Sequence, residues 1–520
     1  MLLALSDELS RFVPLVGGSA HAACLLAPLQ TLACVEEVVV RDQTVVSLRV
    51  VIEALGTSAS AVVVELLSKL AGGAWHTSRT SAAGLFDCAY PKVDAAGQAK
   101  LRSLFAALAA DEAPMVRRAA AANLGKFGGV VGAALVRSEL HPLFTALAGD
   151  DQDSVRLLAV ENCVLLARAL GSAAAVTELV LPTIKQVAGD GSWRVRYMVA
   201  DQFCQLCEAC GAALVEDELV AAFVKLLKDG EAEVRTVAST KVAGVCERIS
   251  VKLAIETILP CITLLVADQS QHVRAALAGA IMQLAPAFGK EATTNHLLAL
   301  YLLLLQDEFP DVRLNVISKI DVVNQVIGIQ LLSKSLLPAI MMLAEDKNWR
   351  VRLAIINYIP LLAQQLGVEF FDEQLSNLCM TWLGDPVCSI RVAAATNLKR
   401  LAEVFGVQWS VNNIVPKVLM LYAHPNYLYR LTTLVAVEGL VAVVGSEVIV
   451  QSLLPLVVRL AVDPVPNVRF NVAKTLRAII PLVDAAVRTA QIQPCLVSLS
   501  ADPDGDVKFC AIQSARAITA

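Results

Sequence analysis

Apolar and polar positions follow one another in blocks that predict pairs of helices joined by short turns. In residues 259–286, an apolar stretch after Pro260 ends at the polar turn 268–271, and apolar residues return at 273, 277, 281 and 284. Spacings of three and four place one apolar stripe on a helix face. A strand would need alternation with period two, and no such alternation is sustained. The block therefore predicts two helices.

The same block recurs along nearly the whole chain. A basic residue follows an apolar one near the start of each second helix, and the intervals between these basic residues are 38, 38, 39 and 40, then 39 eight times. A fixed period of this length is the signature of a repeat protein. The thirteen positions are Arg41, Arg79, Arg117, Arg156, Arg196, Arg235, Arg274, Arg313, Arg352, Arg391, Arg430, Arg469 and Lys508.

Two other residue types keep register with this arginine. Because a cation at a helix start opposes the helix dipole, we expect the aspartate to accept from exposed N–H groups and to pair with the arginine of its own unit or the next. A proline inside a helix removes a backbone hydrogen bond, so we expect each first helix to bend there. The aspartate lies six residues earlier in ten units: Asp111, Asp150, Asp190, Asp229, Asp268, Asp307, Asp346, Asp385, Asp463 and Asp502. The proline lies fourteen residues earlier in seven: Pro142, Pro182, Pro260, Pro338, Pro416, Pro455 and Pro494.

A pair of helices this short cannot bury both apolar faces alone, whereas stacking on its neighbours does so. We therefore predict an all-α chain that forms one solenoid over residues 1–520. The expected architecture is a right-handed, horseshoe-shaped superhelix of 13 full repeats of 39 residues plus a partial N-terminal one.

Composition narrows the possible partners. Lys and Arg total 43 against 48 Asp and Glu, a net charge of −5, which argues against a nucleic-acid partner and a polybasic membrane anchor. The longest uncharged run, 12–35, is cut by a Gly-Gly turn, and Asp7, Glu8 and Arg11 interrupt any signal-peptide core. We expect neither a membrane span nor export. Thirteen cysteines without a framework pattern fit a reducing cytosol.

The repeat pattern resembles HEAT repeats, and several stretches resemble the scaffolding A subunits (65 kDa regulatory A subunits) of protein phosphatase 2A. These stretches include SWRVRYMVAD at 192–201, WRVRLAII at 349–356, HPNYLYR at 424–430 and NVRFNVAK at 467–474. The resemblance implies a non-enzymatic scaffold that forms a heterotrimer with a variable regulatory B-type subunit plus a phosphatase catalytic subunit. The expected location is the cytoplasm, with the nucleus as a further compartment.

The N-terminal end departs from the family pattern of fifteen repeats. Residues 1–18 are expected to be the second helix of a truncated repeat, so that Leu2, Leu3, Leu5 and Leu9 would face nothing. The resemblance implies that residues 19–330 bind the regulatory subunit, whereas residues 331–520 bind the catalytic subunit.

The same resemblance assigns site residues to the short turns. For the catalytic subunit these are Trp349, Arg350, Tyr427, Arg430, Val465 and Asn467. For the regulatory subunit they are Glu36, Trp75, Pro114, Arg117, Arg118, Asp153, Trp193 and Arg194. Trp349 stands out independently, because a polar turn between helices needs no large aromatic residue and exposed Trp, Tyr and Arg commonly anchor interfaces. A role in stabilising the stack remains an alternative for Arg117, and a solvated surface charge for Glu36.

No motif predicts catalysis, a metal site or a cofactor. Cys204, Cys207 and Cys210 have a spacing found in iron–sulfur proteins, but position 214 is Leu and the three residues turn progressively around a predicted helix. We interpret them as small buried hydrophobic residues. An iron–sulfur enzyme and a HEAT-repeat transport adaptor of the importin kind remain the alternatives; the constant repeat length and basic turns argue against the adaptor.

Overall fold

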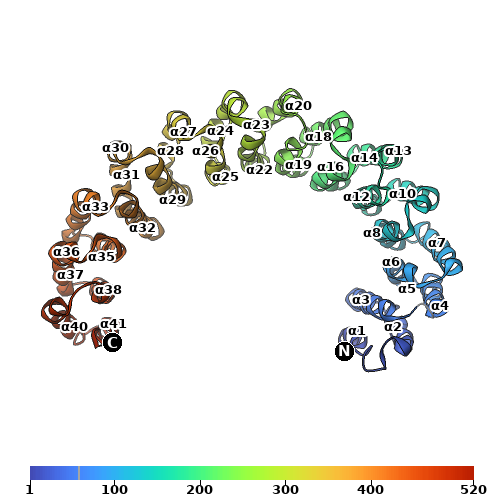
Figure 1. Ribbon diagram of the computed structural model, residues 1–520, viewed down its shortest axis with the longest axis horizontal. Helices are drawn as coiled ribbons and strands as arrows, with labels where there is room; N and C mark the ends of the chain where they lie inside the picture. Colours follow the sequence, from blue (N-terminus) through green and yellow to red (C-terminus); the bar gives the residue numbers. More distant parts are fainter. Residues whose placement is uncertain (57–58, 520) are drawn as a thin grey trace. The chain divides into compact units, whose positions relative to one another are not determined.

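The computed structural model describes residues 1–56 and 59–519, and this part of the chain contains helices and turns but no strand. The residues group into two compact units, Met1–Ala287 and Phe288–Ala520. In each unit, successive helix pairs stack side by side in two rows (Figure 1). The all-α HEAT-type solenoid predicted from the sequence is confirmed at the level of this repeating architecture.

Unit 1 begins with α1 (Leu2–Arg11), which packs on α3. Its second helices each pack against the second helix of the next repeat. They are α3 (Val38–Ala54), α5 (His76–Ala83) with α6 (Phe86–Ala89), α8 (Pro114–Val131), α11 (Asp153–Arg156) with α12 (Ala159–Leu170), α15 (Trp193–Asp201) with α16 (Phe203–Cys210), α19 (Ala232–Cys246) and α22 (Gln271–Ile281). The first helices are α2 (Leu26–Leu32), α4 (Ser60–Ala71), α7 (Ala95–Ala109), α10 (His141–Ala148), α14 (Leu181–Ala188), α18 (Val220–Leu227) and α21 (Leu259–Leu265).

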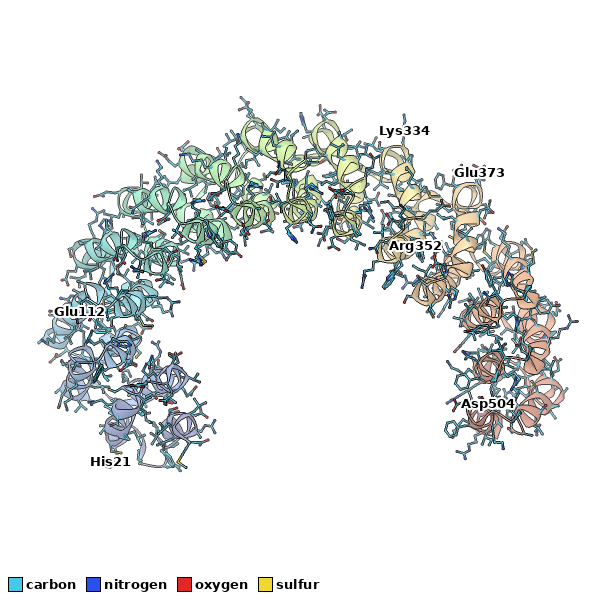
Figure 2. All side chains as sticks on the ribbon, turned by 180° about the vertical axis from the view of Figure 1, so that it is seen from behind. His21, Glu112, Lys334, Arg352, Glu373 and Asp504 are labelled. Atoms are coloured by element: carbon cyan, nitrogen blue, oxygen red, sulfur yellow. The ribbon has the colours of Figure 1, made fainter. Side chains whose placement is uncertain are left out.

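Unit 2 repeats the arrangement. Its second helices are α25 (Pro310–Ile317) with α26 (Ile320–Ile327), α29 (Trp349–Leu366), α32 (Cys388–Phe405), α35 (Tyr427–Val444), α38 (Pro466–Ile479) and α41 (Gly505–Thr519). Its first helices are α24 (Leu298–Leu305), α27 (Ile329–Ser335) with α28 (Leu337–Leu343), α31 (Ser376–Thr381), α33 (Val407–Asn413) with α34 (Val415–Leu419), α37 (Leu454–Arg459) and α40 (Gln493–Leu499). In Figure 2, Arg352 lies on the row of second helices, whereas Lys334 and Glu373 lie on the row of first helices.

The first helices are interrupted near the expected position, but each proline that keeps register with the arginines lies at a helix start and not inside a helix. A π turn at Val136–Leu140 precedes α10, in which Pro142 occupies one of the first two positions. The same turn occurs at Val215–Leu219 and Phe371–Leu375, and no proline follows either of them. The interruption therefore belongs to the repeat itself, and proline fits there because the N–H groups at the first positions of a helix have no intrahelical acceptor.

A glycine with positive φ follows the second helices α26, α29, α32 and α35 of unit 2. Gly328, Gly367, Gly406 and Gly445 have φ values of 82°, 86°, 87° and 83°, and they recur every 39 residues. Side chains rarely adopt this backbone conformation, so glycine is required where the chain leaves the second helix for the next repeat.

The core of unit 1 contains an aromatic cluster. The ring of Phe86 meets those of Phe105 and Phe127 edge-on, with centroid distances of 5.2 and 5.7 Å, and the Tyr90 ring lies 5.4 Å from that of Phe127. The residues come from α6, the turn after it, α7 and α8, so the cluster joins both helix rows.

The expectation for the N-terminal leucines was partly wrong. Leu2, Leu3 and Leu5 are 43–44% exposed, but Leu9 is only 9% exposed because α1 packs on α3. The first helix therefore behaves as one more second helix in the row of unit 1.

One helix in the described part of the chain, α35, is long and apolar enough to cross a membrane by length and composition. It packs between α32 and α38 as a second helix of the stack. This packing inside unit 2 accounts for the apolar residues of α35.

Candidate protein-interaction site

All the predicted site residues lie in the turns between first and second helices or in the opening turn of a second helix. We call this set of turns, considered separately in each unit, the turn row. The period-39 arginines connect each turn to the next, and we call this series of contacts the arginine ladder. Each pairing of an arginine with the aspartate of the next turn is one rung. The ladder supports the turn row.

Each complete rung of the ladder uses both edges of a guanidinium. Arg117 donates from Nη1 to the carbonyls of Asp111 and Glu112 in its own turn, at 2.9 and 3.2 Å. From Nε and Nη2 it donates to the two carboxylate oxygens of Asp150 in the next turn, at 2.6 and 3.1 Å. Asp150 in turn accepts from the backbone N–H of Gln152. The aspartate thus pairs with the arginine of the preceding unit, whereas we expected the arginine of its own unit or the next. The arginine of its own unit, Arg156, donates instead to the main-chain carbonyl of Asp150 at 2.9 Å.

The rungs repeat in both units, and all except that of Arg313 use Nε and Nη2 of the arginine. In unit 1 the arginines of α5, α8, α11, α15 and α19 pair with the next aspartate: Arg79–Asp111, Arg117–Asp150, Arg156–Asp190, Arg196–Asp229 and Arg235–Asp268. In unit 2 the pairs are Arg313–Asp346, Arg352–Asp385, Arg430–Asp463 and Arg469–Asp502. The side chains in these rungs are 4–18% exposed, so the pairs are shielded from water far better than ordinary surface ion pairs.

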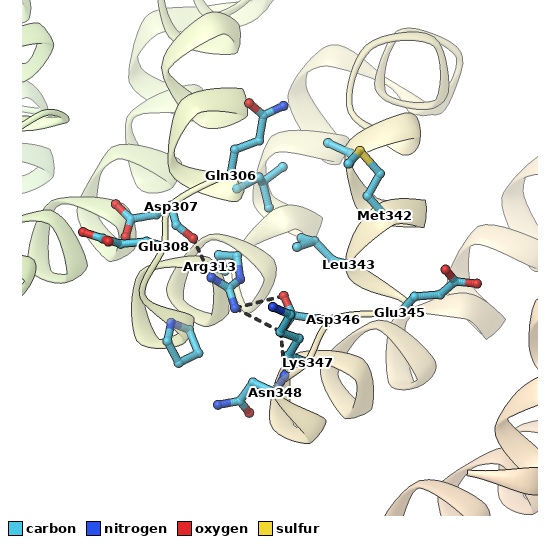
Figure 3. Close-up of a pocket in the computed structure, with 13 residues that line it drawn as sticks. Gln306, Asp307, Glu308, Arg313, Met342, Leu343, Glu345, Asp346, Lys347 and Asn348 are labelled. Carbon is cyan, nitrogen blue, oxygen red and sulfur yellow. Dashed lines mark hydrogen bonds and ion pairs between the residues drawn. The ribbon is translucent and has the colours of Figure 1, made fainter.

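Figure 3 shows the rung formed by Arg313, which reaches across its turn toward Asp346 beside a cavity of about 570 Å³. Arg313 contacts both carboxylate oxygens through Nη2, at 3.0 and 2.9 Å, and its buried Nε has no hydrogen-bond partner. Met342 forms an apolar wall of the cavity and is 74% exposed. A ladder arginine therefore also lines a cavity beside the turn row.

Acid should weaken the ladder. The hydrogen bond from Arg156 holds the pKa of Asp190 below its ordinary value, and Arg469 does the same for Asp502. A carboxylate with a lowered folded-state pKa stabilises the fold fully above its unfolded pKa of about 3.9, and this stabilisation is lost as pH falls through the lowered pKa. We expect the difference in urea stability between the wild type and Asp190→Asn to shrink below about pH 4. A difference that stays constant between pH 7 and pH 3 would contradict this assignment.

Three of the residues predicted for the catalytic subunit lie around one cavity. Tyr427, Val465 and Asn467 line a hollow of about 420 Å³, and Tyr427 is 40% exposed. Arg430 is instead a ladder residue bound to Asp463 at 2.6 Å.

Trp349 differs from the exposed residue that the sequence suggested. It is half-buried, and the guanidinium of exposed Arg350 lies 4.8 Å from its ring centroid. Because the Arg350 side chain stacks on the ring, the two residues present a combined surface in place of a free indole.

The residues predicted for the regulatory subunit follow the turn row of unit 1. Trp75 is 76% exposed and lines a cavity of about 490 Å³ together with Glu36, while Pro114 and Arg118 are exposed on the opening turn of α8. The structure therefore brings Glu36 and Trp75 together, and it places Arg117 in the ladder.

Farther along, Trp193 is 38% exposed, its ring meets that of Tyr197 edge-on at 6.4 Å, and the Arg194 guanidinium lies 5.5 Å from its centroid. Asp153 reaches this group, accepting from the Ser192 hydroxyl at 2.9 Å.

Sequence reasoning missed two features of unit 1. Met115 is 57% exposed and lines the cavity with Trp75. Its position directly after Pro114, where most repeats carry a polar residue, was the available signal. The second feature is that the ladder is interrupted at Arg41, where Gly73 stands in the aspartate position.

The cysteine motif lies inside α16, as predicted. Cys207 and Cys210 are buried and Cys204 is half-buried, and burial raises the pKa of Cys207 to about 12 and that of Cys210 to about 11. These protonated thiols pack as small apolar groups. Among the residues that the structure describes, no group of three or more His, Cys, Asp or Glu side chains is placed to hold a metal ion.

Family models match three parts of the chain: a PPP2R1A-like HEAT repeat over residues 212–289, a PIK3R4-like middle domain over 290–438, and a HEAT repeat over 453–483. Among solved structures, Kap121p bound to RanGTP has a TM-score of 0.65 at 13% identity, covering 99% of this chain and 56% of that one. Yeast importin-β (Kap95p) has a TM-score of 0.57 at 15% identity, covering 99% and 68%. Identities this low establish the fold alone. Fold and repeats together define the class, a HEAT-repeat solenoid.

Within that class, the chain is similar to the scaffold (A) subunits of protein phosphatase 2A, and the resemblance drawn from the sequence is confirmed. The protein phosphatase 2A scaffold subunit of Dictyostelium discoideum is 56% identical over 230 residues, 44% of this chain and 39% of that protein. The regulatory A subunit of Schizosaccharomyces pombe is 49% identical over 220 residues, 42% and 37%. The beta isoform of the human 65 kDa regulatory A subunit is 52% identical over 132 residues, 25% and 22%. Each match thus spans less than two fifths of the relative's length.

Proposed function

We propose that this chain is a non-enzymatic scaffold of a protein phosphatase 2A heterotrimer, acting in the cytoplasm and also in the nucleus. The observation that carries the proposal is the 49–56% identity to proteins named as scaffold or regulatory A subunits. The exposed aromatic residues of the turn row support it, because such residues anchor protein interfaces.

The catalytic subunit would bind the turn row of unit 2. Tyr427, Val465 and Asn467 surround a hollow that can accept a side chain of the partner, and the stacked pair Trp349–Arg350 adds a second contact. Arg430 would hold its turn in place by binding Asp463. The turn itself, and not the buried guanidinium of Arg430, would contact the partner.

The regulatory subunit would bind the turn row of unit 1. Trp75, with Glu36 at its side, and Trp193, with Arg194 over its ring, are exposed anchors there. Pro114 and Arg118 are exposed between them, while Arg117 and Asp153 act through the geometry of the turns. Holding two partners on one chain raises the effective concentration of a substrate bound by one near the active site of the other.

Reconstitution tests this proposal. The full chain is mixed with purified catalytic subunit of protein phosphatase 2A, and the complex is measured by size-exclusion chromatography with light scattering. We expect a 1:1 complex at micromolar concentration, with hydrolysis of a phosphopeptide only when the catalytic subunit is present. The importin-like alternative is tested in parallel with RanGTP. Binding of RanGTP without binding of the catalytic subunit would overturn the proposal.

A further inference from the structure

The arginine ladder is open at Arg41. As in the complete rungs, Nη1 of Arg41 donates to two carbonyls of its own turn, those of Val35 and Glu36, at 2.8 and 2.6 Å. In complete rungs Nε and Nη2 bind the next aspartate, but here the next turn carries Gly73. Within the described residues, no carboxylate lies within ion-pair distance of Arg41, and Nη1 alone of its nitrogens donates a hydrogen bond.

This open guanidinium edge belongs to a largely buried residue. Arg41 is only 7% exposed, so water compensates its charge far less than it would on the surface. A guanidinium presents its donors as a fixed planar fork that matches a carboxylate. The neighbouring rung shows the matching geometry, with Arg79 donating to Asp111 at 2.7 and 3.0 Å.

The site is accessible from outside. Arg41 lines two cavities, one of about 490 Å³ beside the turn row and one of about 510 Å³ between α3, α5 and α8. The first has an apolar wall formed by Trp75, Met115 and Val38, which are 76%, 57% and 55% exposed. A ligand that reaches Arg41 through this cavity would therefore cover apolar surface as well as neutralise the buried charge.

None of the described charged residues around the site forms an ion pair with Arg41, so the site keeps a positive charge. Glu36 and His76 line the first cavity, and exposed Glu36 offers its main-chain oxygen to Arg41. The second cavity is lined by exposed Asp42, which forms no ion pair with Arg41, and by Lys126. Arg49 in the same cavity is already paired with Asp87 at 2.6 and 2.9 Å.

The chain cannot close this rung itself. A Cβ atom on Gly73 would lie 2.1 Å from the hydroxyl oxygen of Ser78, so no side chain at position 73 fits while Ser78 keeps its place. In the complete rungs of unit 1 that follow, the residue before the arginine is valine, as at Val116 and Val155. The open rung is therefore maintained by two local residues, Gly73 and Ser78.

We propose that Arg41 is a carboxylate-binding site for a protein partner that docks on the turn row of unit 1. An aspartate or glutamate side chain of the partner supplies the missing carboxylate to Nε and Nη2, and an apolar residue next to it covers Trp75 and Met115. The identity of that partner as a regulatory subunit rests on the proposed function, whereas the acidic-apolar chemistry of its docking segment follows from the site.

A peptide copied from the ladder itself provides the probe. The capped, fluorescently labelled octapeptide LAADEAPM has the sequence of residues 108–115, whose aspartate binds Arg79 within the chain. Its binding to the full-length chain is measured by fluorescence polarisation. We expect weak saturable binding that falls at least about tenfold when the peptide's aspartate becomes asparagine, as expected for the loss of a charge-assisted pair.

Protein variants locate the site. Arg41→Gln should abolish binding, and Gly73→Asp combined with Ser78→Ala should abolish it by filling the rung from within, while raising the melting temperature. Arg168→Gln, an exposed arginine in the last turn of α12 and outside the turn row, is the matched control and should change binding less than about twofold. The filled-rung variant keeps every charged residue of the turn row, so its loss of binding cannot come from misfolding if it melts higher.

Each contrary result overturns the proposal. No binding by the wild type, equal binding of the aspartate and asparagine peptides, or equal loss in Arg168→Gln and Arg41→Gln would all do so. Full displacement by 5 mM inorganic phosphate, about the concentration at which weak anion sites fill, would assign the site to a free anion. Because no phosphatase subunit is present, these results are independent of the reconstitution that tests the proposed function.

Discussion

Arg196→Met should lower the free energy of unfolding by about 3 kcal/mol, because it leaves the carboxylate of Asp229 buried without its guanidinium. Arg196 donates to the two Asp229 oxygens at 2.6 and 2.9 Å, and the Asp229 side chain is only 6% exposed. Of the complete rung, only the backbone N–H of Glu231 would still donate to it. Urea unfolding followed by circular dichroism measures the loss.

The control for this variant lies two residues away on the same helix. The Arg194 side chain is 63% exposed and meets Asp153 only at 3.6 Å, so Arg194→Met should cost less than about 0.5 kcal/mol. If the two substitutions cost the same, the ladder is not a stabilising element and the sequence periodicity needs another explanation.

The loss should also be local. Each repeat of a solenoid contacts only its neighbours, so its stability is close to a sum of repeat and interface contributions. Arg196 and Asp229 join the repeats of α15 and α19. We expect amide hydrogen exchange in Arg196→Met to accelerate in those two helices and to stay unchanged in α38. Uniform acceleration along the chain would contradict the nearest-neighbour picture.

The ladder explains why the repeat could be predicted from sequence. A complete rung needs an arginine and an aspartate at fixed positions in successive repeats, as with Arg156 and Asp190. Their spacing therefore recurs in the sequence as a period. The pairing of each aspartate with the arginine of the preceding unit was not predicted. The spacing alone does not determine the partner, because the pairing depends on how far the guanidinium extends across the interface between repeats.

The second half of each rung was invisible in the sequence. The Nη1 atom of most ladder arginines donates to two carbonyl groups of its own turn, as Arg352 does to those of Asp346 and Lys347 at 2.6 and 3.3 Å. Arg313 and Arg469 donate to one carbonyl each. Backbone acceptors are present at every position and leave no residue-type signal. These bonds also help to explain how a cation is tolerated at a helix start, since the carbonyls offset part of the unfavourable dipole.

The positions of individual site residues were less predictable than the repeat. A turn residue can point outward or pack on the next helix, and the sequence pattern is the same in both cases. Trp75 is 76% exposed, whereas Trp349 is half-buried under Arg350. Arg430 and Arg117 belong to the ladder, which the spacing indicated for both, although the family resemblance alone would make them contacts. The assignment of these residues to particular partners stays a prediction.

The open rung shows where local irregularity matters. Gly73 breaks a pattern that the later repeats of unit 1 keep, and its consequence depends on the burial of a residue 32 positions earlier in the chain, Arg41, which is 7% exposed. In a regular stack, a departure from the period leaves a gap of defined shape and charge. The open rung at Arg41 therefore indicates more about function than the complete rungs do.

Tyr427→Ala combined with Trp349→Ala should weaken binding of the phosphatase catalytic subunit by about a thousandfold. Truncating an interface anchor costs about 2 kcal/mol or more, and the two residues lie on turns two repeats apart in unit 2, so their effects should add. Tyr427 is the larger contributor, because it is 40% exposed beside the hollow formed with Val465 and Asn467. Biolayer interferometry with purified catalytic subunit measures the affinity.

Trp193→Ala is the matched control for that variant, since it removes an indole that is 38% exposed from the turn row of unit 1. It should leave binding of the catalytic subunit unchanged and weaken binding of a regulatory subunit by about thirtyfold, the equivalent of about 2 kcal/mol. The melting temperature of the double variant should stay close to that of the wild type, because neither side chain is fully buried and neither takes part in the ladder. Unchanged affinity for the catalytic subunit in the double variant would remove the turn row of unit 2 as the binding surface, while a loss shared equally with Trp193→Ala would mean that the two units do not divide the partners between them.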